Sequence, residues 1–493
     1  MLSGSASGCN PAVSSPWEDP FVRERILEHL GGDTLENASA VFVTAEDESP
    51  GILLEPRRME SLVDCLRDSL DVGRSLWDRS SLLLHLDIEY VNFDYPAEPY
   101  LSPGHALAAQ RPVLRAIQEI LLEHRIDPLH IMTGRGHHLV FGVGRESSAC
   151  DRLARIGRIS RTVSDRYLAP QPPYGEIVGE RTGRAYAGAG MVLEHVAHLA
   201  LDRVASRSPI AVLLTAVRTG SGGRGREMVS IDLSEYGDPL HTRCAHIPFT
   251  PTLKLRQQRR VVGEDAVART PVLVPLPVHE MTELQVSRAM RNPRAIADLA
   301  HRASARIPDF SEETEGLVEA YERSRLARFH EWFYEIEPEP VERWPMTYDL
   351  APIDRLPRCM QRIVADPREL LLQPAGILHV VRGLLTVGWH PRHIAGFIAS
   401  RYHRDPRWND VWRKYDPDLR ADFYTRIFSG LFAVGRDDLM DFNCTSTQEK
   451  GYCASTECNF NLESYRSSLL ARRQDERLGD RPLDGILLPD ESL

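Results

Sequence analysis

The sequence contains very little lysine: Lys254, Lys414 and Lys450 are the only lysines among its 59 basic residues, and all the others are arginine. It has no run that approaches 18 apolar residues, which excludes a helix long enough to span a bilayer. It also lacks a charged start followed by an apolar stretch, so no secretory signal is expected. We therefore expect a cytoplasmic protein with no membrane partner.

The net charge of −11 argues against a nucleic-acid partner only if charge is spread evenly along the chain. Residues 254–260 and 392–436 are locally basic, so it is not spread evenly. Arginine supplies a flat, permanently charged group that suits phosphate. Each stretch is equally well explained as a charged surface in contact with water, so charge alone leaves both interpretations open.

The length of 493 residues exceeds what one hydrophobic core supports, and two or three domains are expected. β-rich runs mixed with amphipathic helices predict an α/β (α+β) domain with mixed sheets, followed by a mostly α-helical C-terminal domain. We expect a partly disordered leader over 1–34, the α/β domain over 35–265, a charged helical connector over 266–345, the helical domain over 346–473 and a polar tail over 474–493.

Two acids follow an apolar run in residues 82–90, Leu-Leu-Leu-His-Leu-Asp-Ile-Glu-Tyr. In a strand, residues two apart lie on the same face, so Asp87 and Glu89 are expected to project together near the end of a strand. Two acids that point the same way repel each other unless a cation lies between them, and oxygen ligands suit Mg²⁺ or Mn²⁺. The alternative is a surface strand whose acids are solvated.

A second motif lies in residues 131–143, Ile-Met-Thr-Gly-Arg-Gly-His-His-Leu-Val-Phe-Gly-Val. A strand breaks at two glycines and resumes, and glycine lets backbone N–H groups approach a phosphate closely. Arg135 offers a fork for phosphate oxygens. His138 is expected to point into the space formed by the turn, and His137 away from it. The alternative is a plain hairpin with an exposed arginine and a core histidine.

A third predicted strand, residues 227–233, carries Asp232 near its end. This acid could complete a metal site with Asp87 and Glu89, although a lone acid at the end of a strand is usually only a turn-former. Residues 246–254 follow as an expected extended segment that ends in Lys254.

Together, these three motifs in this order resemble the archaeo-eukaryotic primase superfamily, whose catalytic core carries an hDhD/E motif, a GxxH-type motif and an hD motif. The resemblance covers roughly residues 35–265. It implies that Asp87, Glu89 and Asp232 bind catalytic Mg²⁺ or Mn²⁺. It also implies a nucleotide-binding turn formed by Thr133, Gly134, Arg135, Gly136 and His138.

The basic motif of cellular primases, RxPxSxHxK, is matched only in part. Here it reads His246-x-Pro248-x-Thr250-x-Thr252-x-Lys254, so the proline and the lysine agree. The resemblance implies a triphosphate contact for Lys254, and Arg243 lies close by in the sequence. The clustered cysteines of the zinc knob that many catalytic subunits carry have no counterpart.

The cysteines include no CxxC pair, which makes an ordinary zinc ribbon or zinc finger unexpected. Cys444, Cys453 and Cys458 are separated by eight and four residues, and Cys359 lies upstream. Four thiolates are the ligand set of a 4Fe–4S cluster. The alternative is a set of reduced, buried cysteines.

Residues 353–468 resemble the C-terminal iron–sulfur domain of the primase large subunit. The entry motif is Leu356-Pro-Arg-Cys359, and the later cysteines are followed by Asn461-Leu-Glu-Ser-Tyr465. The resemblance implies a 4Fe–4S cluster on Cys359, Cys444, Cys453 and Cys458. We expect phosphate-binding arginines and base-stacking aromatic residues on the helices between these cysteines: Arg392, Arg401, Arg404, Arg407, Arg413, Arg426, Trp408, Trp412 and Tyr415.

The two resemblances in one chain predict a single-chain DNA primase or primase–polymerase that uses NTPs or dNTPs on single-stranded DNA. Candidate partners are a helicase and other replication or repair proteins. A gap-filling or lesion-tolerant polymerase is a second hypothesis within the same chemistry. A non-catalytic nucleic-acid-binding iron–sulfur protein is a third. A metal-dependent nuclease would also use grouped acids, but it has no need for the nucleotide-binding turn.

Overall fold

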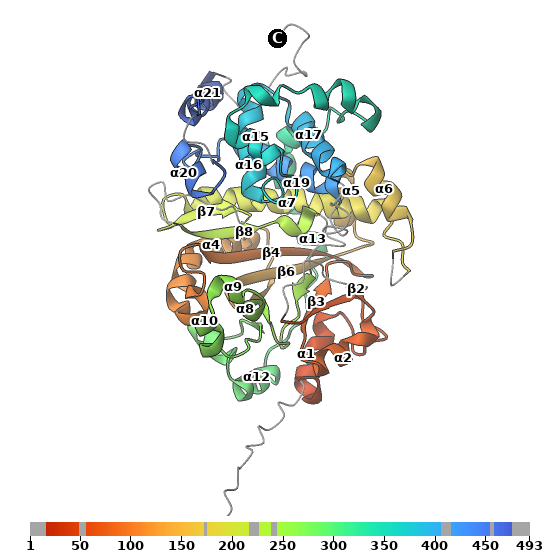
Figure 1. Ribbon diagram of the computed structural model, residues 1–493. Helices are drawn as coiled ribbons and strands as arrows, with labels where there is room; N and C mark the ends of the chain where they lie inside the picture. The colour runs from red at the N-terminus through yellow and green to blue at the C-terminus, as the bar shows by residue number, and fades with distance from the viewer. Residues whose placement is uncertain are drawn as a thin grey trace, which may run out of the picture.

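The computed structural model describes residues 16–48, 56–171, 175–215, 226–237, 244–405, 416–453 and 458–475, without the side chains of Cys244 and of residues 472–475. It has a mixed α/β architecture with two sheets and a region from about residue 290 to 470 that consists mostly of helices (Figure 1). The mixed α/β class and the helical C-terminal region predicted from the sequence are thus confirmed.

The larger sheet has six strands. Their order is β10 (Leu276–Pro277), β5 (Leu129–Met132), β6 (Gly136–Gly144), β4 (Ser81–Asn92), β8 (Glu227–Asp232) and β7 (Ala211–Leu214). Neighbouring strands are antiparallel except for β7 and β8, which are parallel. The two acids of the first motif lie inside the long central strand β4 rather than near its end, since β4 continues to Asn92.

The smaller sheet has four strands. Their order is β2 (Pro56–Arg57), β1 (Val43–Glu46), β3 (Asp71–Ser75) and β9 (Cys244–His246). This sheet shares a core with Val22 and Ile26 of helix α1 and with Leu30, which follows the helix. Tyr100 and Leu273, which lie next to the larger sheet, belong to the same core. The smaller sheet and its helices therefore pack close to one face of the larger sheet.

Helices fill most of the remaining described chain. Those in the N-terminal half are α1 (Pro20–His29), α2 (Leu62–Arg67), α3 (Glu98–Leu101), α4 (Pro103–Glu123), α5 (Ser148–Ile156), α6 (Arg161–Leu168) and α7 (Glu180–Val204). Helices α8 (Lys254–Gln257), α9 (Arg259–Val262), α10 (Glu264–Arg269), α11 (Glu283–Ala289), α12 (Pro293–Ala300), α13 (Ser311–Glu322) and α14 (Arg325–Phe333) follow. The C-terminal helices are α15 (Arg358–Val364), α16 (Pro374–Thr386), α17 (Pro391–Arg404), α19 (Pro417–Ala433), α20 (Cys444–Glu449) and α21 (Leu462–Asp475).

Helices α4 and α7 cover the apolar face of the six-stranded sheet. Leu84, Leu86 and Ile88 of β4 are fully buried in the same core as the apolar residues of these two helices. Because side chains alternate along a strand, His85, Asp87 and Glu89 face the opposite side. The alternation predicted from the sequence thus separates a packed face from a polar one.

Helix α7 also joins the sheet to the C-terminal region (Figure 1). Glu194 of α7 is fully buried, and Arg426 of α19 donates two hydrogen bonds of 3.2 Å to its carboxylate. Helix α19 packs as well on the 3₁₀ helix η3 (Ser234–Gly237), which follows β8 directly. The C-terminal helices are therefore anchored close to the end of the strand that carries Asp232.

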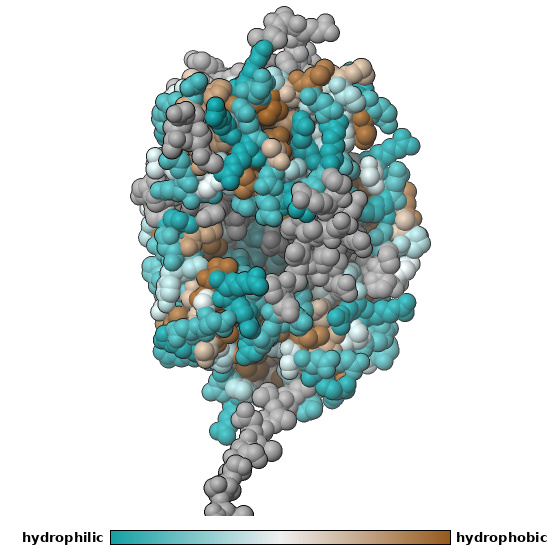
Figure 2. Space-filling view, viewed as in Figure 1, coloured by the Kyte–Doolittle hydropathy of each residue, from teal (hydrophilic) through white to brown (hydrophobic). Residues whose placement is uncertain are grey.

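No helix in the described part of the chain is both long enough and apolar enough to cross a membrane. The face shown in Figure 2 is hollowed at its middle, between the C-terminal helices and helices α8–α10. Strands β4 and β8 lie at this level in the same view.

Candidate active site

The three acids of the sequence motifs lie on two paired strands. Asp87 of β4 is the direct cross-strand partner of Asp232 of β8, and Glu89 is the partner of Ser230. Directly opposed residues of an antiparallel pair have their side chains on the same face. Asp87, Glu89 and Asp232 are only 5%, 5% and 4% exposed. The sheet therefore buries three carboxylates together on its polar face.

The glycine turn lies beside these acids, because β6 pairs with the other edge of β4. Asp87 is opposite His138, and Glu89 is opposite Gly136. A Cβ atom at Gly136 would lie 1.9 Å from the carbonyl oxygen of Ile88, so only glycine allows the turn to approach β4 this closely. The turn is held by two hydrogen bonds: the Thr133 N–H donates to the Gly136 carbonyl at 2.9 Å, and the Gly136 N–H donates to Thr133 Oγ1 at 3.1 Å.

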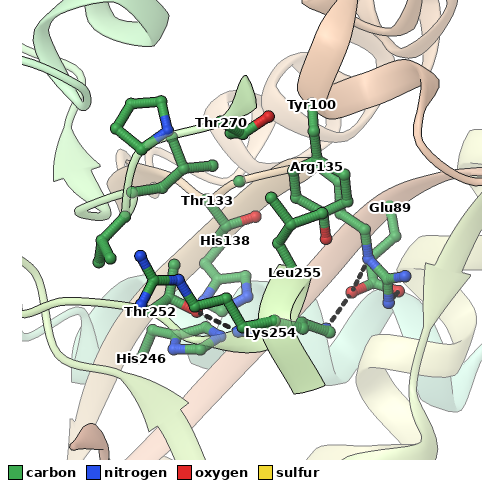
Figure 3. A pocket seen from close by; sticks show the side chains of 15 residues that line it. Glu89, Tyr100, Thr133, Arg135, His138, His246, Thr252, Lys254, Leu255 and Thr270 are labelled. Carbon is green, nitrogen blue, oxygen red and sulfur yellow. Dashed lines mark hydrogen bonds and ion pairs between the residues drawn. The ribbon is translucent and has the colours of Figure 1, made fainter. Parts of the chain in front are cut away.

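A pocket opens in front of the turn (Figure 3). Its lining comprises Glu89, Tyr100, Thr133, Gly134, Arg135, His138, His246, Thr252, Lys254, Leu255, Arg256, Thr270, Pro271, Val272 and Leu273. Five of these, Thr133, Gly134, Arg135, His138 and Lys254, are residues for which the sequence predicted nucleotide contacts. The structure thus brings together segments that are more than a hundred residues apart in the chain.

The segment that carries Lys254 differs from the expectation. Only its first part is a strand, since β9 ends at His246 and Lys254 begins the short helix α8. Between them, Phe249 has a left-handed backbone with φ of 66°, and the chain turns there. The turn allows Lys254 to reach the pocket. Arg243 lies outside the described residues.

The carboxylates on β4 are in opposite electrostatic environments. Burial and the negative charges of Glu89, Glu235 and Asp232 hold the pKa of Asp87 well above its usual range, although Lys254 partly opposes them. Burial also disfavours the charged form of Glu89, but the charges of Arg135 and Lys254 outweigh burial and hold its pKa well below the usual range. Glu89 is thus paired with two cations, whereas Asp87 forms no ion pair with an arginine or a lysine in the part of the chain that the structure describes.

The donor set fits a divalent metal ion. Asp87 Oδ1 is buried and accepts no hydrogen bond from the described residues, and the same holds for the hydroxyls of Ser230 and Ser234. His138 Nε2 lies 3.6 Å from Asp87 Oδ1. Buried carboxylates without partners are costly in an apolar setting, and oxygen ligands are those that Mg²⁺ and Mn²⁺ prefer. Asp87, Glu89 and Asp232 are the residues that would hold such ions.

Two carboxylate–histidine pairs flank His138, and the sequence analysis did not identify them. His85 Nδ1 is in hydrogen-bond contact with Glu235, and its ring meets that of His138 edge to face at 4.4 Å. On the other side, His246 stacks on His138 at 5.8 Å, and its Nδ1 lies 3.5 Å from Asp71. Alternation along β4 could have placed His85 beside Asp87. No local signal points to Glu235 or Asp71.

The prediction for the two adjacent histidines agrees with the structure. His138 lines the pocket, while His137 lies on the other face, where its Nδ1 is 2.9 Å from His130 Nε2. Burial and the neighbouring His85 and His246 hold the pKa of His138 well below its usual range, so the ring is neutral. Its Nδ1 atom is buried without a hydrogen-bond partner among the described residues.

Among the described residues, the four cysteines of the C-terminal region form no disulfide and are not gathered into a closed ligand set. Cys359 is buried, and its Sγ lies 3.2 Å from His379 Nε2, whereas Cys444 is exposed. Burial, together with the charges of Cys453, Cys458 and Cys444, raises the pKa of Cys359 to about 12. The four thiols are therefore electrostatic neighbours. Among the described residues, no three of them approach to within 4.8 Å of one another.

Two of the arginines expected to bind phosphate are instead structural. Arg426 is buried against Glu194, and Arg392 is buried in an ion pair with Asp422 and packs over the ring of Tyr334. The prediction was wrong for this pair because both arginines are buried and are paired with the carboxylates of Glu194 and Asp422. Arg401 and Arg404 are partly exposed beside Asp349, and residues 406–415 lie outside the described residues.

Comparisons of the chain with protein-family models, with curated proteins and with solved structures found no match.

Proposed function

We propose that the protein is a DNA primase or primase–polymerase, which transfers nucleotides from NTPs or dNTPs to a growing strand on a single-stranded DNA template. One observation carries the proposal: the acids of β4 and β8 share a buried face with a glycine turn and with Lys254. Carboxylates on one side and basic groups on the other are what a metal-bound triphosphate requires. The order of the three motifs, which resembles that of the archaeo-eukaryotic primase superfamily, gives the reaction class.

In this proposal Asp87, Glu89 and Asp232 hold Mg²⁺ or Mn²⁺. When bound, such ions activate the attacking 3′-hydroxyl and neutralise charge on the pyrophosphate leaving group. The contribution of the protein is to fix the carboxylates before the ions arrive. Pairing of β4 with β8 sets Asp87 opposite Asp232, so neither backbone position has to move when an ion enters.

The turn and the lysine are proposed to hold the triphosphate. Arg135 and Lys254 both line the pocket and supply positive charge to it, and Gly136 removes the side chain that would keep the turn away from β4. His138 is held between two carboxylate–histidine pairs, which fixes the plane of its ring. A neutral ring in this position is available as a hydrogen-bond partner for a phosphate oxygen or a metal-bound water.

The C-terminal helices are proposed to carry a 4Fe–4S cluster on Cys359, Cys444, Cys453 and Cys458. Four cysteine sulfurs in one electrostatic neighbourhood are the right donor set, although they are not drawn together in the structure. Such a cluster would close the chain from α15 to the segment beyond α20. Helix α19 of this region packs on η3, so an ordered C-terminal region would support the strand end that carries Asp232.

The test is templated incorporation of nucleotides on a primed DNA substrate. Wild-type protein is expected to extend the primer in Mg²⁺ or Mn²⁺, and Asp87→Ala/Glu89→Ala is expected to fold and to incorporate nothing. Arg67→Ala/Asp64→Ala serves as a matched control, because this pair is exposed on α2. Near-normal extension by the Asp87/Glu89 variant would refute the metal-site assignment.

Extension alone would equally suit a gap-filling or lesion-tolerant polymerase. Synthesis on an unprimed template separates that enzyme from a primase. Failure of both assays, with DNA binding intact, would favour the non-catalytic iron–sulfur protein.

A further inference from the structure

Both oxygens of the Glu89 carboxylate are engaged by cations. Arg135 Nη2 donates to Oε2 at 2.7 Å and its Nε donates to Oε1 at 3.2 Å, so the guanidinium grips the carboxylate with two hydrogen bonds. Lys254 Nζ donates to Oε1 at 2.7 Å (Figure 3). Glu89 is buried, whereas Arg135 and Lys254 are 20% and 34% exposed toward the pocket. This three-residue cluster thus separates the metal-binding side of the site from the triphosphate side.

In this cluster, metal binding and triphosphate binding require groups that are already paired with each other. A metal ion needs an oxygen of Glu89, and a triphosphate needs the positive charges of Arg135 and Lys254, yet each group now satisfies the other. In the described residues, the ligand atoms of Asp87, Glu89 and Asp232 do not all come within 4.8 Å of one another. The acids, the turn and Lys254 are therefore in place. The ion pairs of Glu89 with Arg135 and Lys254, however, occupy the groups that would bind the metal ion and the triphosphate.

The other basic groups of the pocket do not relieve this conflict. Arg256 is paired with Glu48, and His246 lies beside Asp71. Leaving Glu89 buried without a partner would cost several times the value of an exposed ion pair. A triphosphate that draws Arg135 and Lys254 away therefore needs something positive to replace them at Glu89.

We propose that Glu89 is an exchange point that links metal binding to triphosphate binding. If a divalent ion is bound, the Glu89 carboxylate would be its ligand and would no longer hold Arg135 and Lys254, which would then be available to the triphosphate. The inference rests on the proposed function. It predicts that metal and triphosphate bind with positive cooperativity beyond their affinity for each other in solution, because each removes a partner that blocks the other. A metal-free site then rejects nucleotide, which prevents unproductive binding.

The first test measures binding of inorganic tripolyphosphate in EDTA by calorimetry. Glu89→Gln removes the charge that holds both cations, so the variant is expected to bind tripolyphosphate about tenfold or more tighter than wild type, the size expected for one freed charge-assisted hydrogen bond. Asp87→Asn is the matched control, since it removes an acid from the same cluster that forms no ion pair with Arg135 or Lys254. An equal gain in both variants, or no gain in Glu89→Gln, would overturn the exchange.

The second test uses the scarcity of lysine and is measured on wild-type protein. Reductive ¹³C-methylation labels Lys254, Lys414 and Lys450 besides the N-terminus, and Lys254→Arg assigns the signal of interest. Mg²⁺ alone is expected to shift the Lys254 signal, because the ion takes Glu89 from the amine. A Lys254 signal that stays unchanged at saturating Mg²⁺ would contradict the proposal.

Failure of the exchange at Glu89 and failure of the proposed function give different results. If wild-type protein binds tripolyphosphate in Mg²⁺ and extends a primer, but Glu89→Gln in EDTA binds no tighter, the exchange is wrong and the proposed function remains. If neither protein binds tripolyphosphate under any condition, the nucleotide site itself is wrong.

Discussion

Asp87 and Asp232 are direct cross-strand partners on β4 and β8, and both carboxylates are buried. Like charges in this position destabilise a sheet unless a cation lies between them. Burial and the neighbouring Glu89, Glu235 and Asp232 raise the pKa of Asp87. A divalent ion, bound as we propose, would relieve the repulsion among these buried acids.

Removal of one of these acids should stabilise the metal-free protein and abolish its response to metal. In EDTA, Asp87→Asn is expected to unfold at a temperature equal to or above that of wild type, because repulsion is reduced. Mg²⁺ or Mn²⁺ should raise the melting temperature of wild type but not that of the variant, since only a folded metal site gains from the ion. A metal-induced shift of equal size in both proteins would contradict the assignment.

Two adjacent buried histidines provide a matched pair for the nucleotide turn. His138→Asn should weaken NTP or dNTP binding in Mg²⁺ while binding of single-stranded DNA persists, because His138 lines the pocket. His137→Asn should leave nucleotide affinity unchanged, since His137 lies on the other face beside His130. Fluorescence titration with a labelled nucleotide measures both. Wild-type affinity in His138→Asn would show that this histidine is structural.

The proposed cluster predicts the iron content of the protein. Anaerobically purified protein should be brown and contain about four irons per chain, as a four-thiolate cubane requires. Cys453→Ser should lose iron and should impair initiation more than extension of a supplied primer, because initiation needs two free nucleotides held at once. Cys150→Ser is the control, since Cys150 is buried in α5, in another part of the chain. Zinc in place of iron, or unchanged initiation in Cys453→Ser, would contradict the cluster.

The buried pair Glu194–Arg426 should be essential for stability. Glu194→Gln leaves Arg426 as an unpaired buried charge and should lower the free energy of unfolding by about 3–5 kcal/mol. Glu463→Gln, in an exposed pair with Arg466, should cost less than about 1 kcal/mol. Denaturant unfolding followed by circular dichroism measures both. Equal stability of the two variants would show that the interior pair contributes little.

The same pair predicts a pH dependence. Burial opposes ionisation of Glu194, but His330 and Arg426 lower its pKa to about 2, below the ordinary value. The stabilisation is therefore present above the ordinary glutamate pKa of about 4.3 and is lost as pH falls toward 2. The difference in stability between wild type and Glu194→Gln should shrink over this range. A difference that grows as the pH falls would contradict the assignment.

The features of the candidate site that could be predicted from the sequence are those that depend on local periodicity. Alternation along β4 fixes Asp87 and Glu89 on one face, and the two glycines fix the turn that adjoins them. The sequence could not predict contacts that depend on distant segments. Glu235 contacts His85 because η3, which carries Glu235, follows β8 and packs against α19. Glu194 is paired with Arg426, which lies 232 residues further along the chain. For the same reason, the sequence could not show that Arg392 and Arg426, which lie in a basic stretch, are buried and paired with carboxylates.

The most direct measurement of the central claim is de novo synthesis on unprimed, single-stranded circular DNA with each labelled nucleotide pool in Mg²⁺ and in Mn²⁺. Wild-type protein is expected to give short, template-dependent products that begin without a supplied 3′-hydroxyl. Asp232→Asn should give at least about a thousandfold less, because metal stabilisation of the transition state amounts to several kcal/mol. Absence of any product from wild type, in a preparation that also fails to extend a primed template, would contradict the account.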